Sequence, residues 1–291
     1  MSRIYDALKR SESERDGEEL LAAAPSVTEL LEAAESRYVQ QAPAVAPVLQ
    51  TAAFEPGGVT VRVSATAESR LVCLTDPGSL GAEKFRVLGL RLRHLRDKRK
   101  LKRIVVTGTA PEEGKSLISA NLALNQSRSR LLKTLLVDGD FRRPTLAKRF
   151  GIGEKLSGLS EHLHGERDLA EVVYKLDGSG LWLLPSGCVP ENPLELMQSG
   201  RLPECLDTLG TFFDWIIIDT PPMFPLADTA YWMKQADGVL LVIREEVSDK
   251  NLLMRAVETI DRSTLLGVVV NSCRSAESNY YYSRYKPESS K

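Results

Sequence analysis

The sequence predicts an α/β protein whose core is a doubly wound, mostly parallel β-sheet, preceded by a helical N-terminal extension. After residue 102, short apolar runs alternate with stretches long enough for helices; the first run leads into a glycine-containing loop, and carboxylates follow two of the runs. Runs that are apolar on both faces are typical of buried parallel strands, and this alternation indicates βαβ units. The expected strands cover residues 104–107, 134–137, 181–184, 215–218, 238–243 and 265–270.

The composition narrows the class of protein. Of the 291 residues, 43% are hydrophobic and 26% are charged, which excludes a disordered chain, a collagen and a disulfide-stabilised miniprotein. A net charge of −1 gives no overall attraction to nucleic acid or anionic lipid. Cys73, Cys188, Cys205 and Cys273 lack metal-ligand spacing and are interpreted as reduced thiols. No apolar run approaches the roughly 18 residues that span a bilayer, and the N-terminus lacks a signal-peptide pattern, so we expect a soluble, cytoplasmic protein.

The part of the chain before the sheet lacks the alternation of strands and helices. Residues 1–10 are predicted to form an amphipathic helix with Ile4 and Leu8 on one face, and a capping box of Ser26 and Glu29 opens a second helix. A segment rich in Ala, Pro, Val and Thr follows and is typical of a linker. The predicted organisation is a helical extension at 1–39, a linker at 40–69, a core domain at 70–274 and a tail at 275–291.

A third helix is predicted over residues 81–99, with Phe85, Leu88 and Leu92 facing inward. It ends in a basic cluster, because residues 91–103 contain eight Lys or Arg and one Asp. Two interpretations stay open. The cluster is either a solvated helix end before a buried strand or a docking surface for an acidic partner or membrane phosphate.

The first strand leads directly into a loop of the phosphate-binding type. Backbone N–H groups of such a loop and of the following helix cradle phosphates, a lysine reaches the β- and γ-phosphates, and a hydroxyl binds Mg²⁺. The strict spacing GxxxxGK[ST] fails by one residue, since position 109 is Thr and the glycine is at 108. The context of strand, loop and helix still predicts nucleotide binding. The residues involved are Gly108, Thr109, Ala110, Pro111, Glu112, Glu113, Gly114, Lys115, Ser116 and Leu117.

Carboxylates stand at the ends of two expected strands. Asp138 and Asp140 follow the second strand, and Asp219 closes the apolar run at 215–218. Residues two apart on a strand point the same way, here toward the edge where the phosphate loop opens. This arrangement predicts a P-loop NTPase site with Mg²⁺ and proton handling, in which Asp219 is the Walker B carboxylate. Asp214 precedes its strand and is predicted to lie at the surface.

The C-terminal tail contains half of the chain's eight tyrosines, without an apolar period that would bury them. A packed terminal strand is one interpretation; the favoured one is a substrate for covalent modification. The tyrosines are Tyr280, Tyr281, Tyr282 and Tyr285.

Together these motifs resemble the bacterial tyrosine kinases (BY-kinases), autokinases of capsule and exopolysaccharide systems, over roughly residues 70–291. The matching segments are T-G-x-x-P-x-x-G-K-S at 107–116, L-V-D-x-D-x-R-R-P at 136–144 and I-I-I-D-T-P-P at 216–222. The segments L-P-S-G at 184–187 and N-P-L-E-L at 192–196 are also similar to those of the family. The resemblance implies a P-loop fold with deviant Walker motifs and an ATP-dependent protein-tyrosine kinase that phosphorylates its own tail, between protomers.

The resemblance also implies roles for individual residues. Lys115 would bind phosphate, Asp138 would accept the proton of the incoming tyrosine, and Ser116, Asp140 and Asp219 would organise Mg²⁺. A tyrosine hydroxyl has a pKa near about 10, so a nearby carboxylate that takes its proton assists the attack. From the residues alone, Asp138 and Asp140 cannot be told apart as the base.

Two departures from the family pattern concern assembly. The E-x-x-R-x-x-R segment of ring-forming members is matched by Glu83 and Arg86 as oligomer contacts, but position 89 is Gly. Many relatives are fused to a transmembrane chain-length regulator, and this chain contains no such segment. The resemblance therefore implies a separate membrane activator, a location at the inner face of the plasma membrane and a cognate tyrosine phosphatase as a further partner.

Two other functions stay open. A ParA/MinD-type ATPase switch shares the deviant Walker fold, but it carries a signature lysine where this chain has Ala110, and it lacks a tyrosine cluster. A regulator that only binds nucleotide is disfavoured by the full set of Lys115, Ser116 and three aspartates. Asn271, at the end of the last strand, either contacts the nucleotide base or is a turn residue.

Overall fold

The computed structural model describes residues 54–129, 131–153, 155–245 and 247–273. The helices expected at 1–10 and near 26–38, the first part of the linker and the tail tyrosines lie outside these ranges. The strands are β1 (Thr60–Val61), β2 (Arg103–Gly108), β3 (Thr134–Asp138), β4 (Tyr174–Leu176), β5 (Leu181–Leu184), β6 (Trp215–Asp219), β7 (Gly238–Arg244) and β8 (Leu265–Asn271). The α-helices are α3 (Val72–Thr75), α4 (Leu80–Lys98), α5 (Lys115–Gln126), α6 (Leu146–Arg149), α7 (Leu159–His164), α8 (Pro193–Gln198), α9 (Arg201–Phe212), α10 (Ala227–Lys234) and α11 (Lys250–Thr259), with 3₁₀ turns η1 (Ala67–Ser69) and η2 (Leu169–Glu171).

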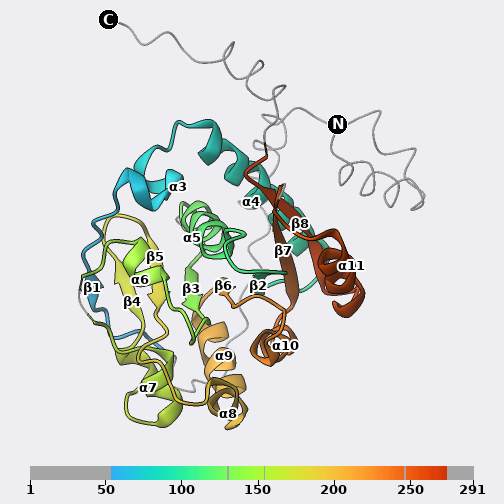
Figure 1. Ribbon diagram of the computed structural model, residues 1–291. Helices are drawn as coiled ribbons and strands as arrows, with labels where there is room; N and C mark the ends of the chain where they lie inside the picture. The colour runs from blue at the N-terminus through green and yellow to red at the C-terminus, as the bar shows by residue number, and fades with distance from the viewer. Residues whose placement is uncertain (1–53, 130, 154, 246, 274–291) are drawn as a thin grey trace, which may run out of the picture. The chain divides into compact units, whose positions relative to one another are not determined.

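The strands form one mostly parallel sheet in the order β1-β4-β5-β3-β6-β2-β7-β8, in which only the β4–β5 pairing is antiparallel. Figure 1 shows α4 and α5 on one face and α8, α9 and α10 on the other. The central strands are buried on both faces, as their continuous apolar runs predict. All six expected strands and the doubly wound α/β class are confirmed.

The helix expected at 81–99 is α4. The Ser79 hydroxyl caps it by accepting a hydrogen bond from the Ala82 N–H at 3.2 Å. Leu92 is fully buried, while Phe85 and Leu88 are half-buried against the same core. The inward face of the prediction is therefore confirmed.

Two strands were not predicted. Strand β4 pairs with β5. The other is the two-residue β1, which lies inside the segment that the sequence assigns to a linker and pairs with β4. Farther along that segment, the Ser64 N–H donates to the Phe150 carbonyl at 3.0 Å. Such short strands are too brief to show a hydrophobic period, and they form because the sheet edge supplies partners. The last part of the linker, from residue 54, thus belongs to the folded unit, and the other domain boundaries stay predictions.

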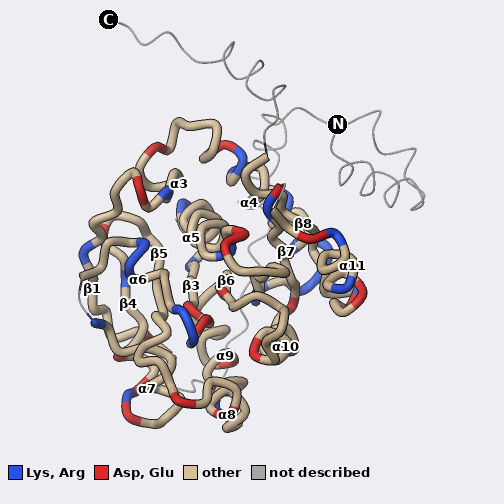
Figure 2. Tube along the Cα trace, in the orientation of Figure 1, with Lys and Arg blue, Asp and Glu red and all other residues tan. Residues whose placement is uncertain are grey.

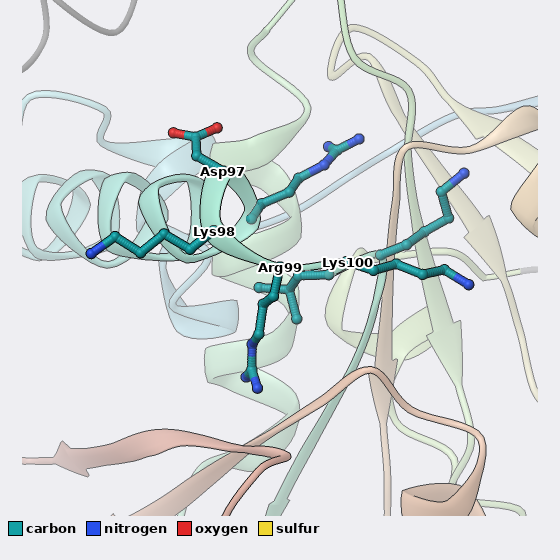
Figure 3. A pocket seen from close by; sticks show the side chains of 7 residues that line it. Asp97, Lys98, Arg99 and Lys100 are labelled. Carbon is teal, nitrogen blue, oxygen red and sulfur yellow. The ribbon is translucent and has the colours of Figure 1, made fainter.

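The basic cluster lies at the end of α4, around an open cavity of about 350 Å³ lined by residues 96–102. Lys98, Arg99 and Lys100 point in different directions (Figure 3). Arg96 stacks on the Trp215 ring at 4.8 Å, and the Lys102 ammonium donates to the Gly210 carbonyl at 2.6 Å. The cluster ends at the first residue of β2, and the phosphate loop begins at the other end of this strand, about 20 Å away. The cluster and the loop therefore lie at opposite ends of the parallel strands. Both interpretations of the cluster stay open.

The four cysteines are free, and Cys73 and Cys205 are buried. Among the residues described, no helix is both long and apolar enough to cross a membrane.

The central position of β6 predicts a measurable stability effect. Ile217 is fully buried, so Ile217→Ala is expected to lower the free energy of unfolding by about 2–5 kcal/mol, measured by chemical denaturation. The control Leu131→Ala, at a side chain that is 74% exposed, is expected to change it by less than about 0.5 kcal/mol. Equal effects of the two substitutions would contradict the assigned core.

Candidate active site

The phosphate loop connects the end of β2 to the start of α5, as the sequence predicts. Gly114 is the N-cap of α5 with φ +98°, a conformation that side chains other than glycine rarely adopt. Its carbonyl accepts hydrogen bonds from the N–H groups of Leu117 and Ile118 at 3.0 and 2.9 Å. The first N–H groups of a helix, with its dipole, favour an anion at this position.

The loop is held from inside by Glu113, whose side chain is fully buried. Its carboxylate accepts hydrogen bonds from the Thr109 hydroxyl at 2.6 Å, the Ala110 N–H at 2.9 Å and the Ser248 hydroxyl at 2.5 Å. The Asn271 amide donates to the Glu113 carbonyl at 2.9 Å. Glu113 was predicted as a loop residue, but this bracing role was missed, because Ser248 lies 135 residues away and no local pattern links the two.

Lys115 folds back over this loop. Its ammonium donates to the Ala110 carbonyl at 2.6 Å, and the residue is 7% exposed. Burial lowers the pKa of Lys115, and the carboxylates of Glu113, Asp219 and Asp140 oppose that shift. The lysine therefore lies among the predicted acidic site residues.

Asp138 and Asp219 are register partners at the ends of the adjacent strands β3 and β6. Both are 1% exposed, and the Oδ1 atom of each is buried without a hydrogen-bond partner in the described part of the chain. Burial raises the pKa of both carboxyls, and the charge of the neighbouring carboxylate raises the pKa of Asp138 further. At Asp219 the Ser116 and Ser119 hydroxyls and Lys115 oppose the rise.

The other oxygen of Asp138 has a structural partner. Its Oδ2 accepts hydrogen bonds from the N–H groups of Thr145 and Leu146, at 3.2 and 3.0 Å, at the start of α6. Asp138 thus ties the segment after β3 to the strand end.

Asp140 is half-buried, two residues beyond β3. Its Oδ1 accepts hydrogen bonds from the N–H groups of Arg142 and Arg143 at 3.1 and 3.0 Å. Figure 2 shows acidic and basic segments next to each other where the chain leaves β3.

The predicted metal ligands suit Mg²⁺. The unpartnered Oδ1 of Asp219 and the adjacent Ser116 hydroxyl are hard oxygen donors. Within the described ranges, no three acidic, His or Cys side chains are grouped closely enough to hold a metal by themselves. Mg²⁺ usually takes one or two carboxylates together with substrate phosphates, so Ser116, Asp140 and Asp219 fit a shared site.

A cavity of about 320 Å³ opens beside the loop, with three arginines in its wall. Arg149 donates to the Ser69 carbonyl at 3.3 Å, while its Nε is buried without a partner among the described residues. Burial lowers the pKa of Arg149, and the Asp219 charge opposes this. The sequence did not predict these arginines as site residues, because they come from distant parts of the chain. Arg70 follows the 3₁₀ turn η1, Arg149 ends α6 and Arg244 ends β7. The wall includes Gly114, Leu117, Asn271, Arg70, Arg149 and Arg244.

Not all predicted site residues meet here. Glu83 and Arg86 lie on α4 and form an ion pair with each other, and Arg86 also bonds the Pro77 carbonyl. Gly89 is buried against α5, where Gln126 donates to its carbonyl at 3.3 Å. The oligomer contact stays a prediction, and the four tail tyrosines lie outside the described residues.

Known proteins share this sequence and architecture, although no family model matches the chain. The tyrosine-protein kinase YwqD of Bacillus subtilis is 32% identical over 218 residues, which are 74% of this chain and 91% of YwqD. The tyrosine-protein kinase CpsD of Streptococcus pneumoniae is 37% identical over 174 residues, 59% of this chain and 76% of CpsD.

Solved structures agree with the sequence relatives. The chimerical protein CapA2B2 superposes with a TM-score of 0.67 at 32% identity, over 76% of this chain and 96% of its own. The kinase domain of the Escherichia coli tyrosine kinase Etk gives 0.65 at 25% identity, over 75% and 90%. The cell division ATPase MinD of Pyrococcus furiosus is more distant, with 0.52 at 26% identity over 60% and 74%.

The buried Glu113 carboxylate gives a test of the loop's architecture. Glu113→Ala removes the acceptor of three hydrogen bonds, and each buried donor left unpaired costs about 1–3 kcal/mol. We expect a lower melting temperature and weaker ADP binding, measured by thermal unfolding and isothermal titration calorimetry. The exposed neighbour serves as the stability control, because Glu112→Gln is expected to leave the melting temperature unchanged. A wild-type melting temperature for Glu113→Ala would show that the carboxylate does not brace the loop.

Proposed function

This chain belongs to the family of bacterial tyrosine-protein kinases, and we propose that it uses Mg·ATP to phosphorylate the tyrosine cluster of its own C-terminal tail. The observation that best supports this site assignment is the buried pair Asp138 and Asp219 beside Lys115, at the strand ends where the phosphate loop opens. A buried carboxylate pair is costly for folding alone, so its place beside a phosphate loop favours a functional role.

The nucleotide would lie along the loop. The N–H groups at the start of α5 face the phosphates, and Lys115 would leave the Ala110 carbonyl to bind them. The cavity beside Gly114 and Asn271 would accept the remainder of the nucleotide, with Arg149 available to an anionic group.

Ser116, Asp140 and Asp219 would hold Mg²⁺. The ion neutralises charge on the transferred phosphoryl group, which together with positioning supplies most catalysis in this reaction class.

Asp138 is the proposed base. Its buried Oδ1 accepts no hydrogen bond from the described part of the chain, so this oxygen is free to accept one from a phenolic O–H. Asp140 differs, because it is half-buried and its Oδ1 caps the turn at Arg142 and Arg143. In the proposed step the tyrosine oxygen bonds to the γ-phosphorus, the bond to the β–γ bridging oxygen breaks, ADP leaves and Asp138 receives the phenolic proton.

The acceptors are Tyr280, Tyr281, Tyr282 and Tyr285. The nine residues from Asn271 to Tyr280 span at most about 30 Å, and Asn271 lies at the phosphate loop, so the cluster starts within reach of this edge of the sheet. We assign the reaction to neighbouring protomers on the family resemblance.

We also place the kinase in a capsule or exopolysaccharide system. There it would act in the cytoplasm, at the inner face of the plasma membrane, with a transmembrane chain-length regulator as activator and a tyrosine phosphatase as its counterpart. Each tail phosphate adds about −1.5 to −2 charges, which would repel packed protomers and release an oligomer. Phosphorylation would in this way control polymer length or export.

Transfer between protomers can be tested by mixing two variants, neither of which can phosphorylate itself. Lys115→Met keeps the tail tyrosines but lacks the phosphate-binding lysine, and a variant with all four tail tyrosines changed to Phe keeps the site. With Mg·ATP and a candidate activator fragment, the mixture is expected to form phosphotyrosine on the Lys115→Met chain, detected by immunoblot, while neither variant reacts alone. Signal in wild type but none in the mixture would contradict transfer between protomers. ATP hydrolysis without phosphotyrosine in wild type would favour the ATPase switch.

The proposed base can be separated from its structural role. Asp138→Asn retains an oxygen that can accept from Thr145 and Leu146, but the amide cannot take the phenolic proton. Phosphotyrosine formation is expected to fall by about 10²–10⁴-fold, with ATP affinity and melting temperature at or above the wild-type values. Asp138→Ala, which also removes the cap, is expected to lower the melting temperature. Near-wild-type phosphorylation by Asp138→Asn would exclude Asp138 as the base.

A further inference from the structure

The loop that bears Asp140 is fastened to α10. The Gly139 N–H donates to the Asp219 carbonyl at 2.8 Å, and the Trp232 indole N–H of α10 donates to the Gly139 carbonyl at 3.0 Å. A Cβ on Gly139 would approach the Trp232 ring to 2.9 Å, so glycine permits this close contact. The chain directly after β3 thus packs against α10, which lies between β6 and β7 in the sequence.

A second fastening is the ion pair of Arg142 and Asp228. Arg142 Nε lies 2.7 Å from Asp228 Oδ2, and Arg142 Nη2 lies 3.3 Å from Asp228 Oδ1, which makes the contact bidentate. The Asp228 side chain is 3% exposed, whereas that of Arg142 is 43% exposed. Bidentate pairs of this kind fix the direction of the guanidinium as well as its distance.

The ion pair and Asp140 share one short turn. Asp140 Oδ1 accepts from the Arg142 N–H, so the backbone that Asp228 fixes through the Arg142 side chain also fixes the Asp140 carboxylate. Arg142 belongs to the motif at 136–144, but sequence reasoning gave it no role, and Asp228 lies 86 residues farther along the chain.

We propose that Asp228 is a positioning residue that acts through Arg142 to hold the Asp140 carboxylate in the orientation that Mg²⁺ binding requires. The inference rests on the proposed function, in which Asp140 helps to hold the metal. Residues that orient metal ligands typically change metal affinity or activity by about 10–100-fold when they are replaced. Arg142 contributes its side chain to Asp228 and its N–H to Asp140, so it transmits the constraint.

The main test is Asp228→Asn, which keeps the side-chain volume and removes the charge. Hydrogen exchange followed by mass spectrometry, without metal or nucleotide, is expected to show at least tenfold faster exchange over residues 139–146. Binding of a fluorescent ADP analogue is expected to need about 10–100-fold more Mg²⁺ for its half-maximal enhancement. Affinity for the analogue without Mg²⁺ is expected to stay within twofold of wild type.

The matched control is Asp207→Asn, which removes another carboxylate paired with an arginine. Asp207 Oδ1 lies 2.5 Å from Nη2 of Arg103, which is the first residue of β2, and the Asp207 side chain is 75% exposed. This variant is expected to match wild type in both measurements. If Asp228→Asn fails to fold, Arg142→Gln removes the same ion pair by changing its more exposed partner. The double variant combines Asp228→Asn with Arg142→Gln. It is expected to need at most twofold more Mg²⁺ than the single variant with the larger effect, because the two residues act as one unit.

Unchanged Mg²⁺ dependence in both single variants would overturn the proposal, even with faster exchange, since the contact would then serve folding alone. Additive effects in the double variant would overturn the route through Arg142. Failure of the proposed function looks different: wild type itself would show no enhancement of nucleotide binding by Mg²⁺, while the exchange result would still report on the loop.

Discussion

The burial of two carboxylates side by side is the constraint on which this structure depends. Asp138 and Asp219 end adjacent strands in register, and neither side chain reaches solvent. Two like charges in a medium of low dielectric raise each other's proton affinity and destabilise the fold unless cations or donors compensate. Lys115, the Ser116 and Ser119 hydroxyls and the N–H groups of α6 supply part of that compensation, and a divalent cation would supply more.

Hydrogen bonds hold the chain around this pair at several points. Glu113 braces the phosphate loop against Ser248, Asp138 holds the start of α6, and Trp232 contacts Gly139. Two of these contacts join the strand ends to distant parts of the chain, since Ser248 lies 135 residues from Glu113 and Trp232 lies 93 residues from Gly139, whereas Asp138 holds the helix that follows its own strand. Phosphoryl transfer relies mainly on positioning and charge, so a site held at several points suits this chemistry better than one on free loops.

The sequence predicted most of the sheet because runs such as those of β2 and β6 are apolar on both faces, which few other structures require. It also predicted Lys115, Asp138 and Asp219 at one edge, since parallel strands carry their following loops to the same side. It missed β4, which is only three residues long. The pairs Glu113–Ser248 and Arg142–Asp228 were missed because residues 135 and 86 positions apart leave no periodic signal.

The fate of the γ-phosphate tests the central claim most directly. Wild-type protein would be incubated with Mg²⁺, an activator fragment and ATP labelled at the γ-phosphate, and the label would be divided into protein-bound and inorganic fractions, with the modified residues mapped by mass spectrometry. The account predicts label on tyrosines between residues 280 and 285, with little inorganic phosphate. Release of nearly all label as inorganic phosphate, with unmodified tyrosines, would contradict it.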